Sequence, residues 1–220
     1  MTKPPRVLGY LGHSNCWRTI RGWIQSGSGG NESIRPWPPT QGDIDLTDYG
    51  GGVLEAWGDP TYTVEGFDPG EKYDLLWSRF DQALNTYGAD FIWMMTFTYV
   101  VRTSSALLGA DVSLIRHISK QIRARTSAPI FFSPMHTYQS GGYCDLAGTA
   151  GVAWSQQLVR YALMKDLVDY AGPQFDYFAA AHIDADTCHC TAAGEARCAE
   201  QLARFFHALT WLKPEHARRL

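Results

Sequence analysis

Short apolar runs alternate along the chain with longer segments in which apolar side chains recur every three or four residues. The short runs are typical of strands buried on both faces, and the longer spacing is typical of helices with one buried side. The predicted strands are residues 6–11, 90–95, 129–132 and 175–180. The predicted helices are residues 16–24, 71–87, 112–122, 153–170 and 202–209. This alternation predicts an α/β fold, a three-layer α/β/α sandwich with four or five mostly parallel strands joined by right-handed helical crossovers.

Residues 25–70 show no comparable period. Gly, Ser, Pro, Asn and Asp dominate this stretch, and only Ile44 and Leu46 suggest a very short strand. Loops of this length are uncommon in a compact domain unless they have a function. We interpret the stretch as an insertion on the active-site side that partly covers the site. The alternative is an ordered surface loop whose aromatic residues, such as Trp37 and Trp57, attach it to the core.

The composition is that of one globular domain spanning residues 1–220, with no repeat and no linker. The net charge of -3 gives no reason to expect nucleic acid as a partner. No apolar run approaches the roughly 20 residues that cross a bilayer. Residues 1–6 lead directly into the first predicted strand, so we expect no signal peptide in this chain. These features specify neither the compartment nor the oligomeric state.

Three residue types that can relay a proton follow two predicted strands at opposite ends of the chain. Ser14 follows the first strand, and Asp186 and His189 follow the last. Side chains at the carboxyl ends of parallel strands gather at one edge of the sheet. A Ser hydroxyl needs a base to become a nucleophile, and a carboxylate can orient that base. Ser14 alone would be interpreted as a helix cap and His189 alone as a surface residue, but together with Asp186 they predict a catalytic triad.

The residues around this triad resemble two sequence blocks of the SGNH/GDSL hydrolase family. The late block, Asp186-x-x-His189-x-Thr191-x-x-Gly194, matches closely, and Gly-His-Ser-Asn at 12–15 is similar to the G-x-S-N variant of the carbohydrate O-acetylesterase branch. The resemblance implies a flavodoxin-like sheet and a serine esterase that needs no cofactor or metal. It would hydrolyse short-acyl or acetyl esters of a small molecule or carbohydrate through an acyl-enzyme. The alternatives are a GDSL-type lipase or thioesterase, and a non-hydrolytic ligand-binding module on the same fold.

The same resemblance implies an oxyanion hole made of three donors. The first is the backbone N–H of Ser14, and the second is a Gly from the family's second block. Gly66, within Glu65-Gly-Phe-Asp-Pro-Gly70, fits that block best, with Gly70 and the Gly run at 50–52 as alternatives. All of these glycines are equally suited to turns.

The third donor in the family is an Asn that follows the strand ending near Met95. Here that strand leads into Thr-Phe-Thr-Tyr at 96–99, with no Asn. We expect Thr98 or Asn15 to take its place, since losing one such donor typically costs about 10²–10³ in rate.

Two histidines are also predicted near the sheet edge. His13 stands where the common form of the first block has Asp, and a buried turn residue is favoured over a substrate contact. His136 follows the third predicted strand and is a candidate for substrate contact.

The five cysteines leave several interpretations open. They are Cys16, Cys144, Cys188, Cys190 and Cys198. If Ser14 and His189 meet, Cys16 must approach Cys188 or Cys190, and a disulfide there would indicate a secreted or periplasmic protein. Reduced buried thiols are an equal alternative. A Cys-His-Cys zinc site is disfavoured, because the spacing is not that of a zinc motif and a metal would occupy the predicted base.

Overall fold

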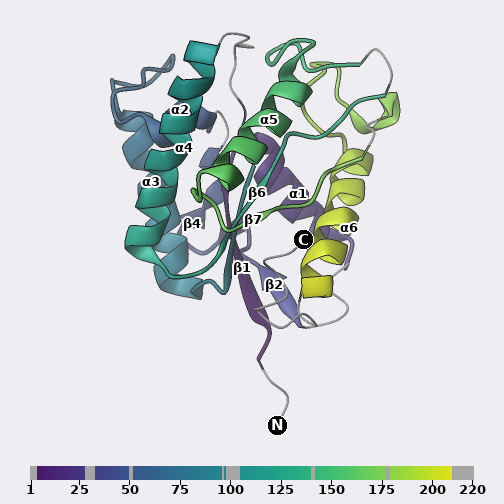
Figure 1. Cartoon of the computed structure of the whole chain (residues 1–220). Coiled ribbons are helices and arrows are strands. Elements are labelled where there is room, and N and C mark those ends of the chain that lie inside the picture. The colour runs from purple at the N-terminus through teal and green to yellow at the C-terminus, as the bar shows by residue number, and fades with distance from the viewer. Residues whose placement is uncertain are drawn as a thin grey trace.

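Five strands form the central sheet of the computed structural model, and every neighbouring pair runs parallel. The structure describes residues 4–27, 33–49, 52–95, 97, 105–139, 142–176 and 179–209. Across the sheet the strands are β2 (Ile34–Pro36), β1 (Arg6–Gly12), β5 (Phe91–Met95), β6 (Ile130–Ser133) and β7 (Tyr170–Ala171). Gly12 pairs with Met95, and Met95 pairs with Ser133. The carboxyl ends of the three central strands therefore lie side by side, at the upper edge in Figure 1.

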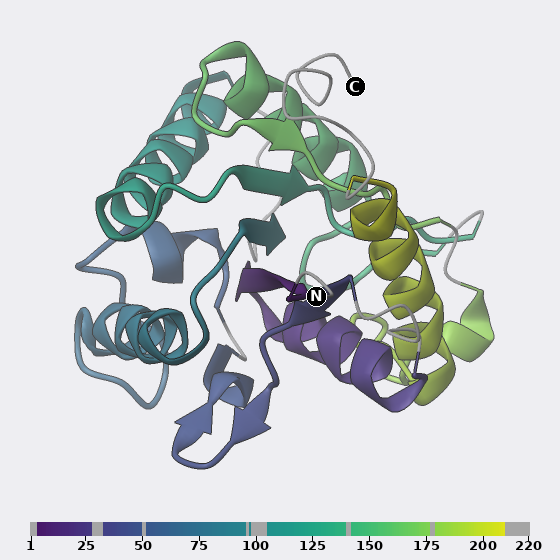
Figure 2. The same cartoon turned by 90° about the horizontal axis from the view of Figure 1, so that it is seen from below.

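Helices cover both faces of this sheet. Figure 2 shows α1 (Ser14–Gln25) and α6 (Ala192–Leu209) together on one face, and α3 (Glu71–Tyr87), α4 (Ser105–Arg125) and α5 (Gly151–Met164) on the other. Every residue of β5 and β6 is buried, as expected for parallel strands between two helical layers. The predicted α/β/α sandwich with a mostly parallel sheet is confirmed.

The pair formed by α1 and α6 is packed unusually closely. A Cβ added to Gly22 would lie 2.6 Å from the backbone oxygen of Glu195, so only glycine allows this approach. The Arg21 guanidinium also donates to the buried Glu195 carboxylate at 2.9 Å. Because α1 starts at Ser14 and α6 starts just after His189, this contact holds the two predicted catalytic segments together.

The last strand and the helix before it differ from their predictions. The strand predicted at 175–180 is wrong, since β7 is Tyr170–Ala171. The helix predicted to reach residue 170 ends at Met164, where Asp166 adopts a positive φ of 52° and turns the chain. The sequence predicted a longer helix because the apolar residues that follow this turn also face the core and happen to keep the helical spacing. Phe175 is buried against Trp93 with the ring centroids 5.8 Å apart, although it lies outside any strand.

The described parts of the 25–70 stretch hold more regular structure than the sequence pattern indicates. They are β2, a hairpin of β3 (Thr40–Gln41) and β4 (Ile44–Asp45), the 3₁₀ helix η1 (Leu46–Tyr49) and α2 (Leu54–Gly58). Trp37 and Trp57 are fully buried, and their indole N–H groups donate to the backbone oxygens of Gly88 and Gly12 at 2.7 and 2.8 Å. This stretch is therefore attached to the core through its aromatic residues, and its Val53 reaches the candidate site.

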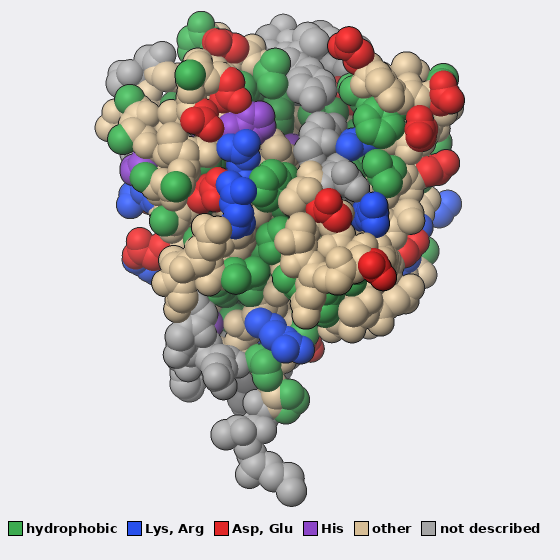
Figure 3. Space-filling view, turned by 180° about the vertical axis from the view of Figure 1, so that it is seen from behind, with side chains coloured by type: hydrophobic (Ala, Val, Ile, Leu, Met, Phe, Trp, Pro, Cys, Tyr) green, Lys and Arg blue, Asp and Glu red, His purple; other side chains and the backbone are tan. Residues whose placement is uncertain are grey.

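Acidic and basic side chains are interspersed on the face shown in Figure 3, in keeping with the small net charge of -3. Within the described ranges, no helix is both long enough and apolar enough to span a membrane.

Candidate active site

Ser14 is placed by the turn between β1 and α1. Gly12 has a φ of +144°, and a Cβ there would lie 2.0 Å from the backbone oxygen of Met95, so this turn requires glycine. The Trp57 indole N–H stabilises this turn by donating a hydrogen bond to the backbone oxygen of Gly12. His13 then caps α1, and Ser14 is its first residue. The Ser14 hydroxyl therefore sits at the positive end of a helix dipole, beside backbone N–H groups that have no partner within the helix.

Asp186 and His189 lie in a tight loop that leads into α6. One oxygen of the Asp186 carboxylate accepts hydrogen bonds from the backbone N–H groups of Cys188 and His189 at 3.0 and 2.9 Å. Its other oxygen contacts Nδ1 of His189. Burial acts to raise the pKa of Asp186, but the hydrogen bonds from His189 and Cys188 and the nearby imidazole lower it to about 2. The carboxylate is therefore ionised near neutral pH, and it holds the Nδ1–H tautomer of His189.

The two segments meet although 175 residues separate them. Nε2 of His189 lies 2.7 Å from Oγ of Ser14, a hydrogen-bond distance, and Nδ1 of the same ring faces Asp186. With the ring proton on Nδ1, Nε2 is left as the acceptor for the Ser14 hydroxyl. The structure thus brings the three residues predicted from sequence into one line, in the order that a proton relay from serine requires.

Asn15 ties the histidine loop to α1. Its amide nitrogen donates to the backbone oxygen of Cys188 at 2.8 Å, and its amide oxygen accepts from the backbone N–H of Cys190 at 3.2 Å. The side chain is only 3% exposed. Asn15 was expected to replace the missing oxyanion donor, but its side-chain amide is already engaged with the loop and serves to position it.

The predicted disulfide of Cys16 with Cys188 or Cys190 is wrong, because Cys188 pairs with Cys144. Cys16 is a free, buried thiol that donates to the backbone oxygen of Met95 at 3.0 Å, and burial raises its pKa. Two positions along a helix turn the side chain by about 200°, so the Cys16 thiol points toward Met95 of the sheet and not to the side that Ser14 faces. Cys190 and Cys198 are also free and buried. Cys144 gave no sequence signal, because it lies in a turn without any period.

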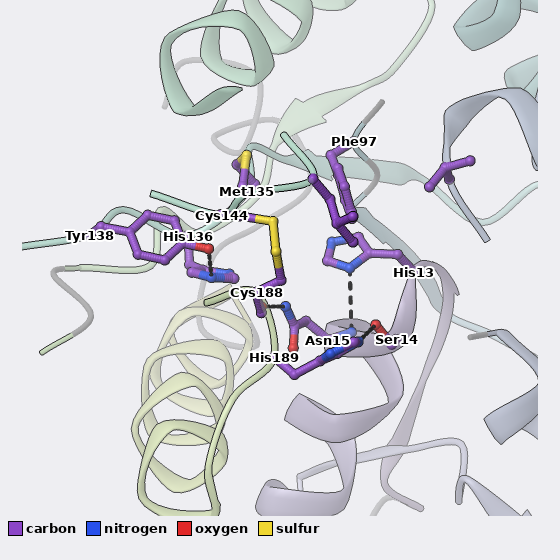
Figure 4. Close-up of a pocket in the computed structure, with 12 residues that line it drawn as sticks. His13, Ser14, Asn15, Phe97, Met135, His136, Tyr138, Cys144, Cys188 and His189 are labelled. Atoms are coloured by element: carbon purple, nitrogen blue, oxygen red, sulfur yellow. Dashed lines mark hydrogen bonds between the residues drawn. A yellow bond between two sulfur atoms is a disulfide. The ribbon is translucent and has the colours of Figure 1, made fainter. Parts of the chain in front are cut away.

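Ser14 and His189 open into a pocket of about 90 Å³. Its walls are formed by Val53, Phe97, Met135, the Cys144–Cys188 disulfide and three polar rings, those of His13, His136 and Tyr138. Figure 4 shows His136 and Tyr138 on one side of the pocket, and His13 and Phe97 on the other. A pocket of this volume holds only a small chemical group.

Both predicted histidines at the sheet edge line this pocket. His136 is 1% exposed, and its Nε2 lies 2.8 Å from the Tyr138 hydroxyl. Burial, followed by the nearby His189 ring, lowers the pKa of His136 to about 4. His13 is 2% exposed, and burial with the nearby His136 and His189 lowers its pKa well below the usual value. Both rings are therefore neutral near pH 7.

The predicted glycine donor, Gly66, does not line the pocket among the described residues. It is exposed in a turn with a φ of +85°. Gly70 precedes α3 and packs against the backbone of Pro60. Gly52 is buried next to Val53, which lines the pocket. Thr98, together with positions 50 and 51, lies outside the described residues.

Across the described part of the chain, no group of three or more His, Cys, Asp or Glu side chains is arranged to hold a metal ion.

No protein-family model matches the chain, and no curated protein matches its sequence. Solved structures do match. A family two carbohydrate esterase from Clostridium thermocellum in complex with cellohexaose is similar with a TM-score of 0.54 and 16% identity, covering 96% of this chain and 67% of that one. An active-site mutant of a family two carbohydrate esterase from the same organism is similar with a TM-score of 0.51 and 13% identity, covering 96% and 66%.

A protein from Bacillus subtilis is also similar, with a TM-score of 0.51 and 9% identity, and the match covers 94% of this chain and 57% of that one. The chain thus spans about two thirds of the length of the two esterase structures. At these identities the likeness shows the shared fold, a mostly parallel α/β sheet flanked by helices.

Proposed function

We propose that this protein is a serine esterase that removes short acyl groups, acetyl above all, from a carbohydrate. The observation that carries the proposal is the contact of 2.7 Å between Ser14 Oγ and His189 Nε2, with Asp186 behind the imidazole. A serine hydroxyl with a base in hydrogen-bond reach, and a third group that orients the base, is the arrangement of covalent acyl transfer.

The chemistry follows from which atoms face each other. His189 Nε2 takes the hydroxyl proton as Ser14 Oγ attacks the ester carbonyl, and Asp186 stabilises the resulting imidazolium. The backbone N–H of Ser14, at the start of α1, is directed toward the negative charge that develops on the carbonyl oxygen. His189 then returns the proton to the leaving alcohol, which departs and leaves an acyl-Ser14. Water, deprotonated by the same ring, cleaves this intermediate and releases the carboxylic acid.

The substrate class rests on three observations. The small pocket beside Ser14 favours an acetyl group over a long acyl chain, since Val53, Phe97 and Met135 close it. The alcohol half is proposed to be a carbohydrate because the similar Clostridium thermocellum structures are carbohydrate esterases, one of them in complex with cellohexaose. Tyr143, which is 41% exposed, lies in a second hollow that shares Tyr138 with the pocket and offers an aromatic face to a sugar ring.

Hydrolysis of p-nitrophenyl acetate and p-nitrophenyl octanoate tests the reaction. We expect turnover of the acetate, a much slower reaction with the octanoate, and release of acetate from an acetylated cello-oligosaccharide. Ser14→Ala is expected to abolish turnover, whereas the matched control Ser78→Ala, at an exposed position of α3, retains it. Equal background rates for the wild-type protein and Ser14→Ala would favour the non-hydrolytic binding module. Preference for the octanoate would favour a lipase.

A further inference from the structure

The ring of His13 has a defined proton position. As the cap of α1, its Nδ1 accepts a hydrogen bond from the backbone N–H of Asn15 at 3.4 Å. An accepting nitrogen carries no proton, so the neutral ring carries its proton on Nε2. Burial, and the nearby rings of His136 and His189, keep the ring neutral by lowering its pKa. His13 is therefore a hydrogen-bond donor through Nε2 near neutral pH.

That donor is buried and has no partner among the residues that the structure describes. A buried polar group without a partner destabilises the fold, so a donor of this kind at a pocket calls for a ligand that accepts from it. His13 lines the pocket into which Ser14 and His189 open. Its ring is fixed by edge-to-face contact with Phe97, with the centroids 4.6 Å apart and the planes at 89°. Figure 4 shows the ring between Phe97 and the first turn of α1, across the pocket from His136.

We propose that Nε2–H of His13 donates to the carbonyl oxygen of the bound ester and to the oxyanion that this oxygen becomes. The inference rests on the proposed esterase function and adds a catalytic residue to it. His13 immediately precedes Ser14, so its donor and the Ser14 backbone N–H belong to one turn and reach the same side of the attacked carbonyl. The side-chain amide of Asn15, which was the alternative donor, is already engaged with the histidine loop.

This assignment also accounts for the departure of the sequence from the SGNH pattern. The strand ending at Met95 is followed by Thr-Phe-Thr-Tyr and not by the motif that holds an Asn donor. His13 stands in place of an Asp, which when ionised can only accept. His13 thus provides a hydrogen-bond donor at a position where the SGNH motif has an acceptor. The segment after Met95, which holds the Asn donor in that family, has no Asn here.

A pair of substitutions separates donation into the pocket from capping of α1. His13→Asn keeps a short side chain whose oxygen can cap the helix at the place of Nδ1, but it removes the donor at the place of Nε2. His13→Gln places an amide N–H near the position of Nε2. We expect kcat for p-nitrophenyl acetate to fall by about 10²–10³ in His13→Asn, with little change in KM, and to recover in part in His13→Gln.

A second readout follows the oxyanion itself. A serine-directed phosphonate forms an adduct with a negative oxygen at the same place, so its inactivation rate should fall in parallel with kcat/KM across the two variants. In the wild-type protein, ¹⁵N NMR should show His13 Nε2 protonated and Nδ1 unprotonated, and the Nε2 proton should move downfield when the phosphonate binds. This spectrum tests the proposal even if a variant does not fold.

The possible outcomes are distinct. The role of His13 would be overturned by an unchanged kcat in a folded His13→Asn variant. It would also be overturned if the chemical shift of the Nε2 proton did not change when the phosphonate binds. Neither result would contradict the esterase function. A wild-type protein without turnover, and without labelling of Ser14, would instead overturn the proposed function itself. Equal losses in both variants, accompanied by equal losses of thermal stability, would show a structural role for His13 only.

Discussion

The two sides of the candidate active site are built by different means. Ser14 is placed by the backbone of the fold, through β1, the turn that Gly12 permits and the first turn of α1. Asp186 and His189 lie on a loop with little regular structure, and their side chains are 51% and 29% exposed. That loop is held by the amide of Asn15 and by the Cys144–Cys188 disulfide. The nucleophile is thus fixed by secondary structure, whereas the base depends on a few individual contacts.

This difference predicts where the site is easiest to break. On the Ser14 side, damage requires a change that the backbone cannot accept, such as a side chain at Gly12. On the His189 side, the loss of one side chain or one covalent bond is enough. Changes at Asp186, Cys144, Cys188 and Asn15 should therefore reduce activity or stability in ways that surface changes nearby do not.

Replacing the carboxylate should have the largest effect on catalysis. In Asp186→Asn, the side-chain oxygen still accepts from the loop backbone, but the ring of His189 loses its charged partner and the tautomer that this partner holds. We expect kcat for p-nitrophenyl acetate to fall by about 10⁴-fold with little loss of thermal stability. Asp184→Asn is the matched control, since Asp184 is exposed on the same loop and its carboxylate faces Arg18, at 3.6 Å, rather than His189. A kcat near that of the wild-type protein in Asp186→Asn would contradict the triad.

Removing the disulfide should have the next largest effect, this time on stability. The bond joins positions 44 residues apart, and closing a loop of this length in the unfolded chain is worth about 4 kcal/mol. We expect Cys144→Ser/Cys188→Ser to lower the free energy of unfolding in urea by this amount. Hydrogen exchange should quicken around residues 184–190 more than in α1. Intact mass before and after reduction and alkylation checks that the bond is present, and equal stability with and without it would contradict this role.

Protonation of buried His136 in acid should destabilise the protein by less than the loss of the disulfide. It should destabilise the protein by more than the Asn15→Ala substitution considered next. The pKa of buried His136 is about 4, below the unfolded value of about 6.5, so the unfolded chain binds a proton that the folded chain does not. His136 alone should therefore lower the free energy of unfolding by about 3 kcal/mol as the pH drops from about 6.5 to 4, and His13, whose pKa burial also lowers, adds to this loss. His136→Gln should flatten this slope in urea titrations. Asp186, with its pKa near 2, weakens the fold only below about pH 4. An identical slope in the variant would contradict burial of a neutral ring.

Truncating Asn15 should cost less stability than the loss of the disulfide or the protonation of His136. Asn15→Ala leaves the backbone oxygen of Cys188 and the N–H of Cys190 without their partner, at a cost of about 2 kcal/mol. The loop should then hold His189 less firmly, so kcat should fall. Denaturant unfolding and steady-state kinetics measure the two effects. The exposed Asn85→Ala, on α3, serves as the control.

The fold and the grouping of Ser14, His189 and Asp186 were predictable from the sequence because each rests on a local pattern. Apolar runs mark β1, β5 and β6, and the parallel sheet they imply brings the segments after its strands to one edge. The rest has no such pattern. β2 is three residues long and includes Arg35 and Pro36, so it carries no apolar run. The partner of Cys188 depends on how a turn near Cys144 folds back across the sheet edge, which spacing along the chain does not encode.

Mass spectrometric mapping of a serine-directed phosphonate tests the central claim most directly. After reaction with the wild-type protein, we expect the label on Ser14 alone, and we expect His189→Gln to slow the labelling strongly because the hydroxyl then lacks its base. Label on another residue, or labelling of Ser14 at the same rate without His189, would contradict the account.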